Sequence, residues 1–262
     1  MRCKHCNARL ANHDIWCVEC GRQSDVVKTE LSAMKSLKKT YKAFLPEKAL
    51  AIPGTAFMLI AGVLPILVLL WVFNKYISLE SGTAMQMLMN LGIKSIAISV
   101  FIPIILSAFN AMCSHTNYQL SFSSMMSSLK SYPRYLGYAL ISALFFSIIY
   151  IIGFGFPSFA SLPILRLVWI VLVNYWVAIV LPAVVLMEQF SLSPWQAIKK
   201  SYRHFHDLRW NIYYLALVLG IINLVALLLL FVPLIFTLPL SMFAIRDYTR
   251  LLVEYELLDY RR

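Results

Sequence analysis

Long apolar runs separated by short charged clusters are the main pattern of this chain. Beyond Lys48 most of these runs reach the roughly 20 residues that a membrane-spanning helix needs. We therefore predict six spanning helices, the last two joined by a tight turn near Pro233, because proline cannot donate a backbone hydrogen bond. The predicted spans are residues 50–73, 95–113, 135–156, 165–187, 210–231 and 234–252.

The last hairpin is the weakest part of this pattern. Only 36 uncharged residues separate Arg209 from Arg246, which is barely enough for two full spans. Pro233 and Pro239 interrupt this stretch, so we expect a turn at the first proline and a kink at the second. A shallow or re-entrant hairpin is the alternative.

The composition agrees with a membrane protein. Apolar residues make up 60% of the 262 residues and charged residues 13%, against roughly 45–50% and 25% in soluble domains. These proportions exclude a soluble enzyme, a disordered chain and a disulfide-stapled secreted miniprotein. The predicted fold class is an all-α polytopic membrane protein with six transmembrane helices and cytoplasmic interfacial helices.

The net charge of +11 indicates an orientation. With the N-terminus inside, 20 of the 23 basic residues fall on the inner side, and only Lys75, Lys94 and Arg166 fall outside. No apolar signal segment follows Met1, so we expect the segment up to Lys48 to stay where it is made. We predict a multi-pass protein of the cytoplasmic (inner) membrane with both termini cytoplasmic. Its positive charge is expected to meet anionic lipids rather than nucleic acid.

Four N-terminal cysteines form a metal-binding pattern. Cys3 and Cys6 make one C-x2-C knuckle, and Cys17 and Cys20 make a second one farther along the segment. Two such knuckles provide the four thiolates that structural zinc prefers, and a closed shell leaves no position for substrate. Two disulfides are the alternative, which a reducing compartment disfavours. We predict one structural zinc ion, and a positive φ at the Asn7 and Gly21 that follow the knuckles.

A basic amphipathic helix is predicted between the cysteines and the first span. Apolar residues recur there at three- and four-residue steps, and the lysines lie mostly on other faces. Ser24 or Asp25 can cap its start, and Pro46 is expected to end it. The helix either docks on a lipid surface or a partner, or is a solvated connector. The domain prediction is a zinc ribbon at 1–24, this linker helix at 25–48 and a six-helix transmembrane domain at 49–262.

An internal repeat is visible when Lys130–Tyr132 is placed on Lys200–Tyr202, because span two then aligns with span four. Each unit contains a span running inward, an amphipathic interfacial helix and a span running outward. The expected apolar stripes are Phe122, Met125, Met126, Leu129 and Tyr132 in the first helix, and Trp195, Ile198, Tyr202 and Phe205 in the second. Parallel repeats occur in transporters whose substrate site lies between the halves, and also in simple bundles that grew by duplication.

Two segments resemble known families. Met1–Ser24 resembles the zinc-ribbon modules at the front of many prokaryotic membrane proteins. The segments SPWQAIKKSY and RDYTRLLVEYE resemble the membrane-domain family of glycerophosphoryl diester phosphodiesterases and related integral membrane proteins. The second resemblance implies an all-helical fold with cytoplasmic interfacial helices. It does not imply a phosphodiesterase, because the soluble catalytic domain of that family is absent from this sequence.

Few residues are candidates for chemistry. No Asp, Glu, Lys or His falls in the middle of a predicted span, whereas ion coupling and acid–base catalysis need titratable groups there. Three span asparagines, Asn110, Asn174 and Asn223, are expected to hydrogen-bond across helices. We expect contacts to lipid headgroups or to a partner from Lys35, Lys38, Lys39, Arg166, Lys199, Lys200, Arg203, Arg246 and Arg250. Arg166 either grips a lipid phosphate or snorkels to the headgroups.

These patterns lead to one functional hypothesis and an alternative. The leading hypothesis is a non-enzymatic membrane subunit or scaffold that docks a protein partner through its zinc ribbon and basic helix, in envelope or lipid transport. The alternative is a passive or lipid-conducting transporter whose path lies between the duplicated units. A hydrophobic cavity that opens sideways would favour the alternative.

Overall fold

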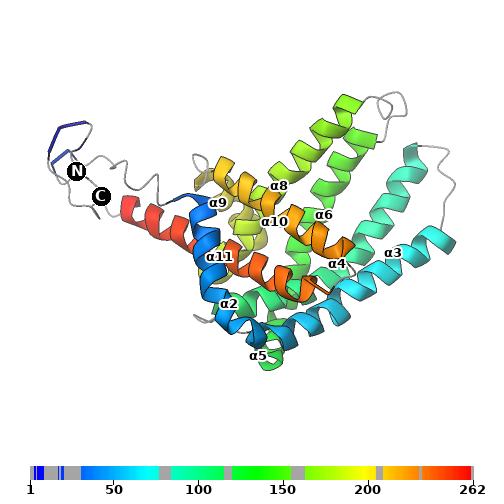
Figure 1. The fold of residues 1–262 in the computed structure, drawn as a ribbon. Coiled ribbons are helices and arrows are strands. Elements are labelled where there is room, and N and C mark those ends of the chain that lie inside the picture. Colours follow the sequence, from blue (N-terminus) through cyan, green and yellow to red (C-terminus); the bar gives the residue numbers. More distant parts are fainter. Residues whose placement is uncertain are drawn as a thin grey trace.

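The computed structural model describes residues 3, 5–8, 17, 19–20, 31–76, 84–114, 120–154, 163–204, 209–229 and 232–260 (Figure 1). Every secondary-structure element in these ranges is helical, which confirms an all-helical fold for this part of the chain. The α-helices are α2 (Ala33–Met58), α3 (Leu64–Tyr76), α4 (Ala84–Ser114), α5 (Phe122–Ser128), α6 (Tyr132–Phe154), α8 (Pro163–Gln189), α9 (Pro194–His204), α10 (Arg209–Leu228) and α11 (Leu234–Tyr260). A π-helical turn, η1 (Leu59–Val63), joins α2 to α3, and a 3-10 turn, η2 (Leu129–Ser131), joins α5 to α6.

Five helical stretches in the described residues are long and apolar enough to cross a membrane. The predicted sixth span, in α11, is not among them. The apolar start of α11 from Leu234 to Ile245 is only about 18 Å long, against a hydrocarbon core of roughly 30 Å, before Arg246 and Asp247 enter the helix. The five stretches are Ala33–Lys75, Met89–Ala111, Phe122–Ile151, Leu167–Gln189 and Arg209–Leu228.

The first stretch is one bent helix rather than a linker helix followed by a separate span. The helix continues through Pro46 and Pro53, so the expectation that Pro46 ends it is wrong. Each proline removes one backbone hydrogen bond and bends the helix without ending it, and the π-helical turn absorbs a further change of register. Figure 1 shows the chain changing direction within α2, so that the second part of this helix already runs toward α3. The predicted start near Asp25 lies outside the described residues.

Helix α8 is the centre of the bundle. Nine of the 25 buried residues of the largest apolar cluster lie on α8 between Trp176 and Met187, more than on any other helix, and residues of α4, α6, α9, α10 and α11 pack around them. The ring of Trp176 stacks on Phe145 of α6 with centroids 3.8 Å apart. A helix that is apolar on all sides is expected to lie inside a bundle, and the part of α8 from Trp176 onward does so, whereas its first turns are exposed.

Helices α2 and α11 pack antiparallel, so that segments near the two ends of the chain lie side by side. The rings of Phe44 and Phe243 lie 5.8 Å apart. Farther along, the hydroxyl of Tyr248 donates a hydrogen bond of 2.9 Å to the carbonyl oxygen of Leu31. The start of α2 and the second half of α11 are therefore neighbours, although they lie near opposite ends of the sequence.

Polar groups within the spans connect helices, as predicted. The amide of Asn174 on α8 donates to the backbone oxygen of Tyr213 on α10 at 3.1 Å. The amide of Asn223 on α10 donates to the hydroxyl of Ser241 on α11 at 2.8 Å. Such bonds fix helix pairs where no water competes for the amide.

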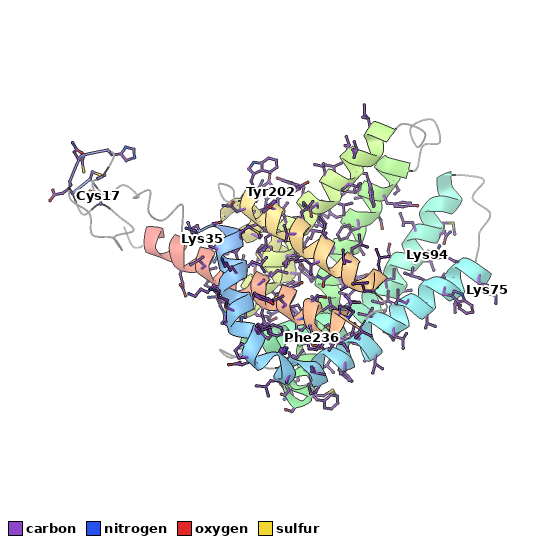
Figure 2. The ribbon with its side chains drawn as sticks, viewed as in Figure 1. Cys17, Lys35, Lys75, Lys94, Tyr202 and Phe236 are labelled. Carbon is purple, nitrogen blue, oxygen red and sulfur yellow. The ribbon has the colours of Figure 1, made fainter. Side chains whose placement is uncertain are left out.

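Figure 2 places Lys75 and Lys94 together at the end of the α3–α4 hairpin, on the opposite side of the bundle from Lys35. The ammonium of Lys94 donates to the side-chain oxygen of Asn74 at 2.8 Å, so the two lysines belong to one end of the hairpin. This separation agrees with the sequence pattern, which assigns Lys75 and Lys94 to one side of the membrane and Lys35 to the other.

Candidate functional site: cysteine cluster and two pockets

The four cysteines lie together, and their sulfur atoms are all within 4.8 Å of one another. The sulfurs of Cys3 and Cys20 are 3.6 Å apart, and those of Cys6 and Cys17 are 3.3 Å apart. These distances exceed the roughly 2.05 Å of a disulfide bond, and the four cysteines are free. Tetrahedral coordination with metal–sulfur bonds of roughly 2.3 Å places sulfurs about 3.8 Å apart. The cluster is close enough to ligate one metal ion.

The first knuckle has the turn geometry that its sequence predicts. Asn7 has a φ of 64°, in the left-handed region that the sequence indicated for this position. The backbone N–H of Asn7 donates to the oxygen of Cys3, and the N–H of Cys3 donates to the oxygen of Ala8, both at 2.9 Å. Gly21, the matching residue of the second knuckle, lies outside the described residues.

Backbone donors make one of the sulfurs a ready ligand. Hydrogen bonds from the backbone N–H groups of Cys6 and His5 lower the pKa of Cys3 to about 6. The backbone N–H of Ala8 also favours the Cys6 thiolate, but hydrogen bonding with the sulfur of Cys17 and burial together raise the pKa of Cys6 to about 12. Thiolates this close repel one another, which disfavours the loss of all four protons. A bound cation offsets this repulsion and favours all four thiolates.

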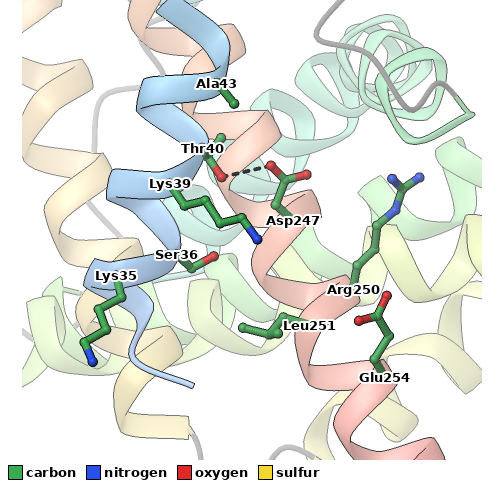
Figure 3. Close-up of a pocket in the computed structure, with 9 residues that line it drawn as sticks. All are labelled: Lys35, Ser36, Lys39, Thr40, Ala43, Asp247, Arg250, Leu251 and Glu254. Atoms are coloured by element: carbon green, nitrogen blue, oxygen red, sulfur yellow. Dashed lines mark hydrogen bonds between the residues drawn. The ribbon is translucent and has the colours of Figure 1, made fainter. Parts of the chain in front are cut away.

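A polar cleft lies between α2 and α11 (Figure 3). Its volume is about 590 Å³. Figure 3 shows Thr40 and Asp247 facing each other across the cleft, and the threonine hydroxyl donates to the carboxylate at 2.8 Å. The cleft contains three of the basic residues that the sequence singled out. Its lining residues are Lys35, Ser36, Lys39, Thr40, Ala43, Asp247, Arg250, Leu251 and Glu254.

Arg246 lies beneath this cleft rather than on its surface. Its side chain is 1% exposed, its guanidinium lies over the ring of Phe243, and it forms an ion pair of 2.8 Å with Asp247. The expectation that Arg246 contacts lipid or a partner therefore needs correction. A buried arginine is retained where its charge is paired, and here it orients the carboxylate that Thr40 also binds.

The basic residues of α9 fall into two environments. Lys200 places its ammonium 3.9 Å from the centroid of the Phe190 ring, and Arg203 is exposed. Lys199 lines an apolar pocket instead. Lys38 is exposed on α2 and does not line the cleft of Figure 3. The side chain of Arg166 lies outside the described residues.

The apolar pocket is bounded by α6, α8 and α9 and has a volume of about 470 Å³. Apolar and aromatic side chains form nearly all of its surface. Tyr202 of α9 lines the pocket and is half-exposed. The residues that line it are Phe145, Ile148, Ile149, Leu172, Tyr175, Trp176, Ile179, Trp195, Ile198, Lys199 and Tyr202.

Two charged groups that the sequence did not single out as sites are fixed by tertiary contacts. Arg134 of α6 forms an ion pair of 2.8 Å with Glu188 of α8, and the hydroxyl of Tyr135 donates to the same carboxylate at 2.8 Å. Arg209 lies against the rings of Tyr175 and Tyr202 and donates hydrogen bonds to both residues. No periodicity relates these partners, so only the fold brings them together.

Comparison with known proteins identifies no relative. No family model matches the chain, and neither a curated protein nor a solved structure matches it. The resemblance to the phosphodiesterase membrane-domain family is therefore not supported by a family match. The class of protein that the chain itself supports is an all-helical membrane protein with a cysteine cluster near its N-terminus.

Proposed function

We propose that this chain is a non-enzymatic membrane subunit that docks a protein partner on the side that carries the cysteine cluster and the cleft between α2 and α11. The cleft is the observation that supports the proposal most directly. Lys35 and Lys39 line it from α2 and Glu254 lines it from α11 (Figure 3), so an acidic segment with one basic residue fits its charges. Envelope or lipid transport is the process that we assign to such a subunit.

The cysteine cluster holds one structural zinc ion in this proposal. Four sulfur ligands and no other nearby donor among the described residues are typical of structural zinc, and a closed shell leaves no position for a substrate. So short a segment gains its folding free energy from the metal. The zinc-bound ribbon is then a rigid surface that the partner can recognise.

We assign the protein to the cytoplasmic membrane with both termini on the cytoplasmic side. The antiparallel packing of α2 and α11 supports this assignment, because Tyr248 reaches Leu31 and so keeps both ends on one side. Since α10 is long enough to cross and the apolar part of α11 is short, the return to the cytoplasmic side passes through a short sixth segment around which the bilayer is locally thinned.

Affinity purification of the tagged full-length protein from native membranes in mild detergent tests the docking proposal. Wild type is compared with a Cys17→Ser plus Cys20→Ser variant and a Lys35→Glu plus Lys39→Glu variant. The matched control is Lys42→Glu plus Lys48→Glu, which reverses two exposed charges of α2 outside the cleft. We expect a stoichiometric partner in wild type and control, and its loss in both test variants. Reproducible turnover by the purified protein alone contradicts the proposal.

The pocket bounded by α6, α8 and α9 favours a second candidate function, passive movement of lipid. It is the kind of apolar cavity beside a span that a lipid-conducting protein requires. Transport of a fluorescent phospholipid between the leaflets of vesicles that contain only this protein tests it. Flux at the rate of empty vesicles contradicts this candidate and leaves the docking proposal unaffected.

A further inference from the structure

The pocket between α6, α8 and α9 has the walls of a preformed binding site. Its volume of about 470 Å³ lies within the roughly 300–1,000 Å³ of small-molecule sites. The stacked pair of Phe145 and Trp176 forms one wall, with ring centroids 3.8 Å apart. Aromatic rings fixed in this way lose little entropy when a ligand packs on them.

Helix α9 forms the opposite wall and is fixed in place. The hydroxyl of Ser201 donates a buried hydrogen bond of 2.8 Å to the backbone oxygen of Ile179 on α8. Ala197 and Ile198 are buried on the same face. Arg209, held between Tyr175 and Tyr202, fixes the end of the pocket where α9 gives way to α10. The opening therefore does not depend on a mobile loop within the described part of the chain.

The residues around the pocket indicate that it opens toward hydrocarbon rather than water. Leu144, Ile148 and Leu172 are exposed apolar residues of candidate spans on either side of it. Trp195 and Tyr202 are 57% and 50% exposed, and such half-exposed aromatic residues are typical of the membrane–water boundary. Lipid acyl chains are the abundant apolar groups next to such an opening.

Lys199 is the cation whose side chain lines the pocket, whereas the charge of Arg209 lies against Tyr175 and Tyr202. Lys199 is the lysine among the described lining residues, and none of those residues is acidic. Its neighbour Lys200 lies on the Phe190 ring instead. The aliphatic stem of Lys199 lines the pocket, and its exposed ammonium at the edge suits the phosphate oxygens of a lipid.

We propose that this pocket binds one acyl chain of an anionic phospholipid, whose phosphate lies against Lys199. The apolar lining takes the chain, Lys199 supplies the charge, and Trp195 and Tyr202 cover the glycerol region. This lipid site is separate from the proposed docking of a protein partner, and it does not depend on the cysteine cluster. Loss of the cysteines is therefore expected to remove a partner and leave the lipid in place.

Native mass spectrometry of the full-length protein in nanodiscs tests the proposal. The probe lipids are phosphatidylglycerol and phosphatidylethanolamine in equal proportion. We expect one retained lipid per chain, predominantly phosphatidylglycerol. The variant Lys199→Gln is expected to retain it about fivefold less, which is the typical contribution of one lysine near anionic headgroups. Lys42→Gln, an exposed lysine of α2 outside both pockets, is the matched control and should retain lipid like wild type.

A second measurement needs no change of the lysine. Phospholipids brominated on the acyl chain quench nearby tryptophan fluorescence, and Trp176 and Trp195 both line the pocket. We expect brominated phosphatidylglycerol to quench wild type more than brominated phosphatidylethanolamine, and the difference to shrink in Trp195→Phe. Equal quenching by the two lipids, equal retention by Lys199→Gln and wild type, or a protein segment found in the pocket in place of lipid overturns the proposal.

Discussion

Helices α4, α5 and α6 form one unit, and α8, α9 and α10 repeat its plan farther along the chain. In both units a short helix follows a long apolar helix and packs back on it. In the first unit this helix, α5, is seven residues long and continues as a 3-10 turn, whereas α9 is a single helix of 11 residues. The joint before α5 is closed around the buried Leu120, whereas α8 and α9 of the second unit form the apolar pocket together with α6 of the first.

Helix α2 explains this difference. Leu120, just before α5, is fully buried and packs on Gly54 of α2 so closely that a Cβ on Gly54 would be 2.2 Å from the leucine Cγ. The backbone N–H of Leu120 also donates to the oxygen of Leu50 at 3.3 Å. No described residue of α2 lines the apolar pocket. The same plan therefore gives a closed joint where α2 covers it and an open pocket where α2 does not reach.

Leu120→Ala is expected to give the largest effect. The substitution leaves a cavity in a closed space. Such a change lowers the free energy of unfolding by about 2–5 kcal/mol when neighbouring side chains cannot move in to fill the cavity. The matched change, Ile198→Ala, enlarges a pocket that already exists and should cost less. Thermal unfolding of both variants in the same detergent measures the difference. Equal losses contradict the distinction between a closed joint and an open pocket.

Gly54→Ala is expected to destabilise the same joint by overpacking. The added Cβ meets both the side chain and the backbone oxygen of Leu120 at less than 3 Å, and such insertions typically cost about 1–3 kcal/mol. Gly220→Ala on α10 is the control, because a Cβ there meets no atom within 4 Å and helix propensity favours alanine. The thermal midpoint of the control should equal or exceed that of wild type. A loss in both variants indicates a general effect of glycine replacement.

Ser201→Ala is expected to loosen α9 while leaving the first unit intact. It removes the buried hydrogen bond to Ile179, which contributes about 1 kcal/mol. Ser127→Ala in α5 removes only an exposed bond to the backbone of Ser124 and should have no measurable effect. Hydrogen exchange of the α9 amides reports the change directly. Unchanged protection of α9 in Ser201→Ala shows that this bond does not hold the helix.

Removal of the cysteine cluster is expected to have the smallest effect on either unit. We propose one zinc ion per chain, and elemental analysis should find it in wild type but not in the Cys17→Ser plus Cys20→Ser variant, because two of four ligands are gone. The described cysteines pack only on one another and on Ala8, so the thermal midpoint of the bundle should stay unchanged. A fall in that midpoint contradicts the separation of the module from the membrane helices.

Much of the molecule follows from local pattern. Apolar runs located the long helices, the C-x2-C spacing located the four clustered sulfurs, and the asparagine after Cys6 indicated its positive φ. The errors have a common origin. Pro46 does not end its helix and Arg246 is not at the surface, because packing of α2 against α11 compensates for the proline and buries the arginine beside Asp247.

The sequence alone determined that this chain is helical, apolar enough for a membrane and equipped with a four-cysteine cluster, since length, hydrophobicity and ligand spacing are properties of short segments. Only the tertiary structure decided where binding surfaces lie. The cleft joins Lys35 to Glu254, and the pocket joins Phe145 to Lys199. Such surfaces depend on which helices meet and which gaps no side chain fills, and no periodicity in the chain encodes that.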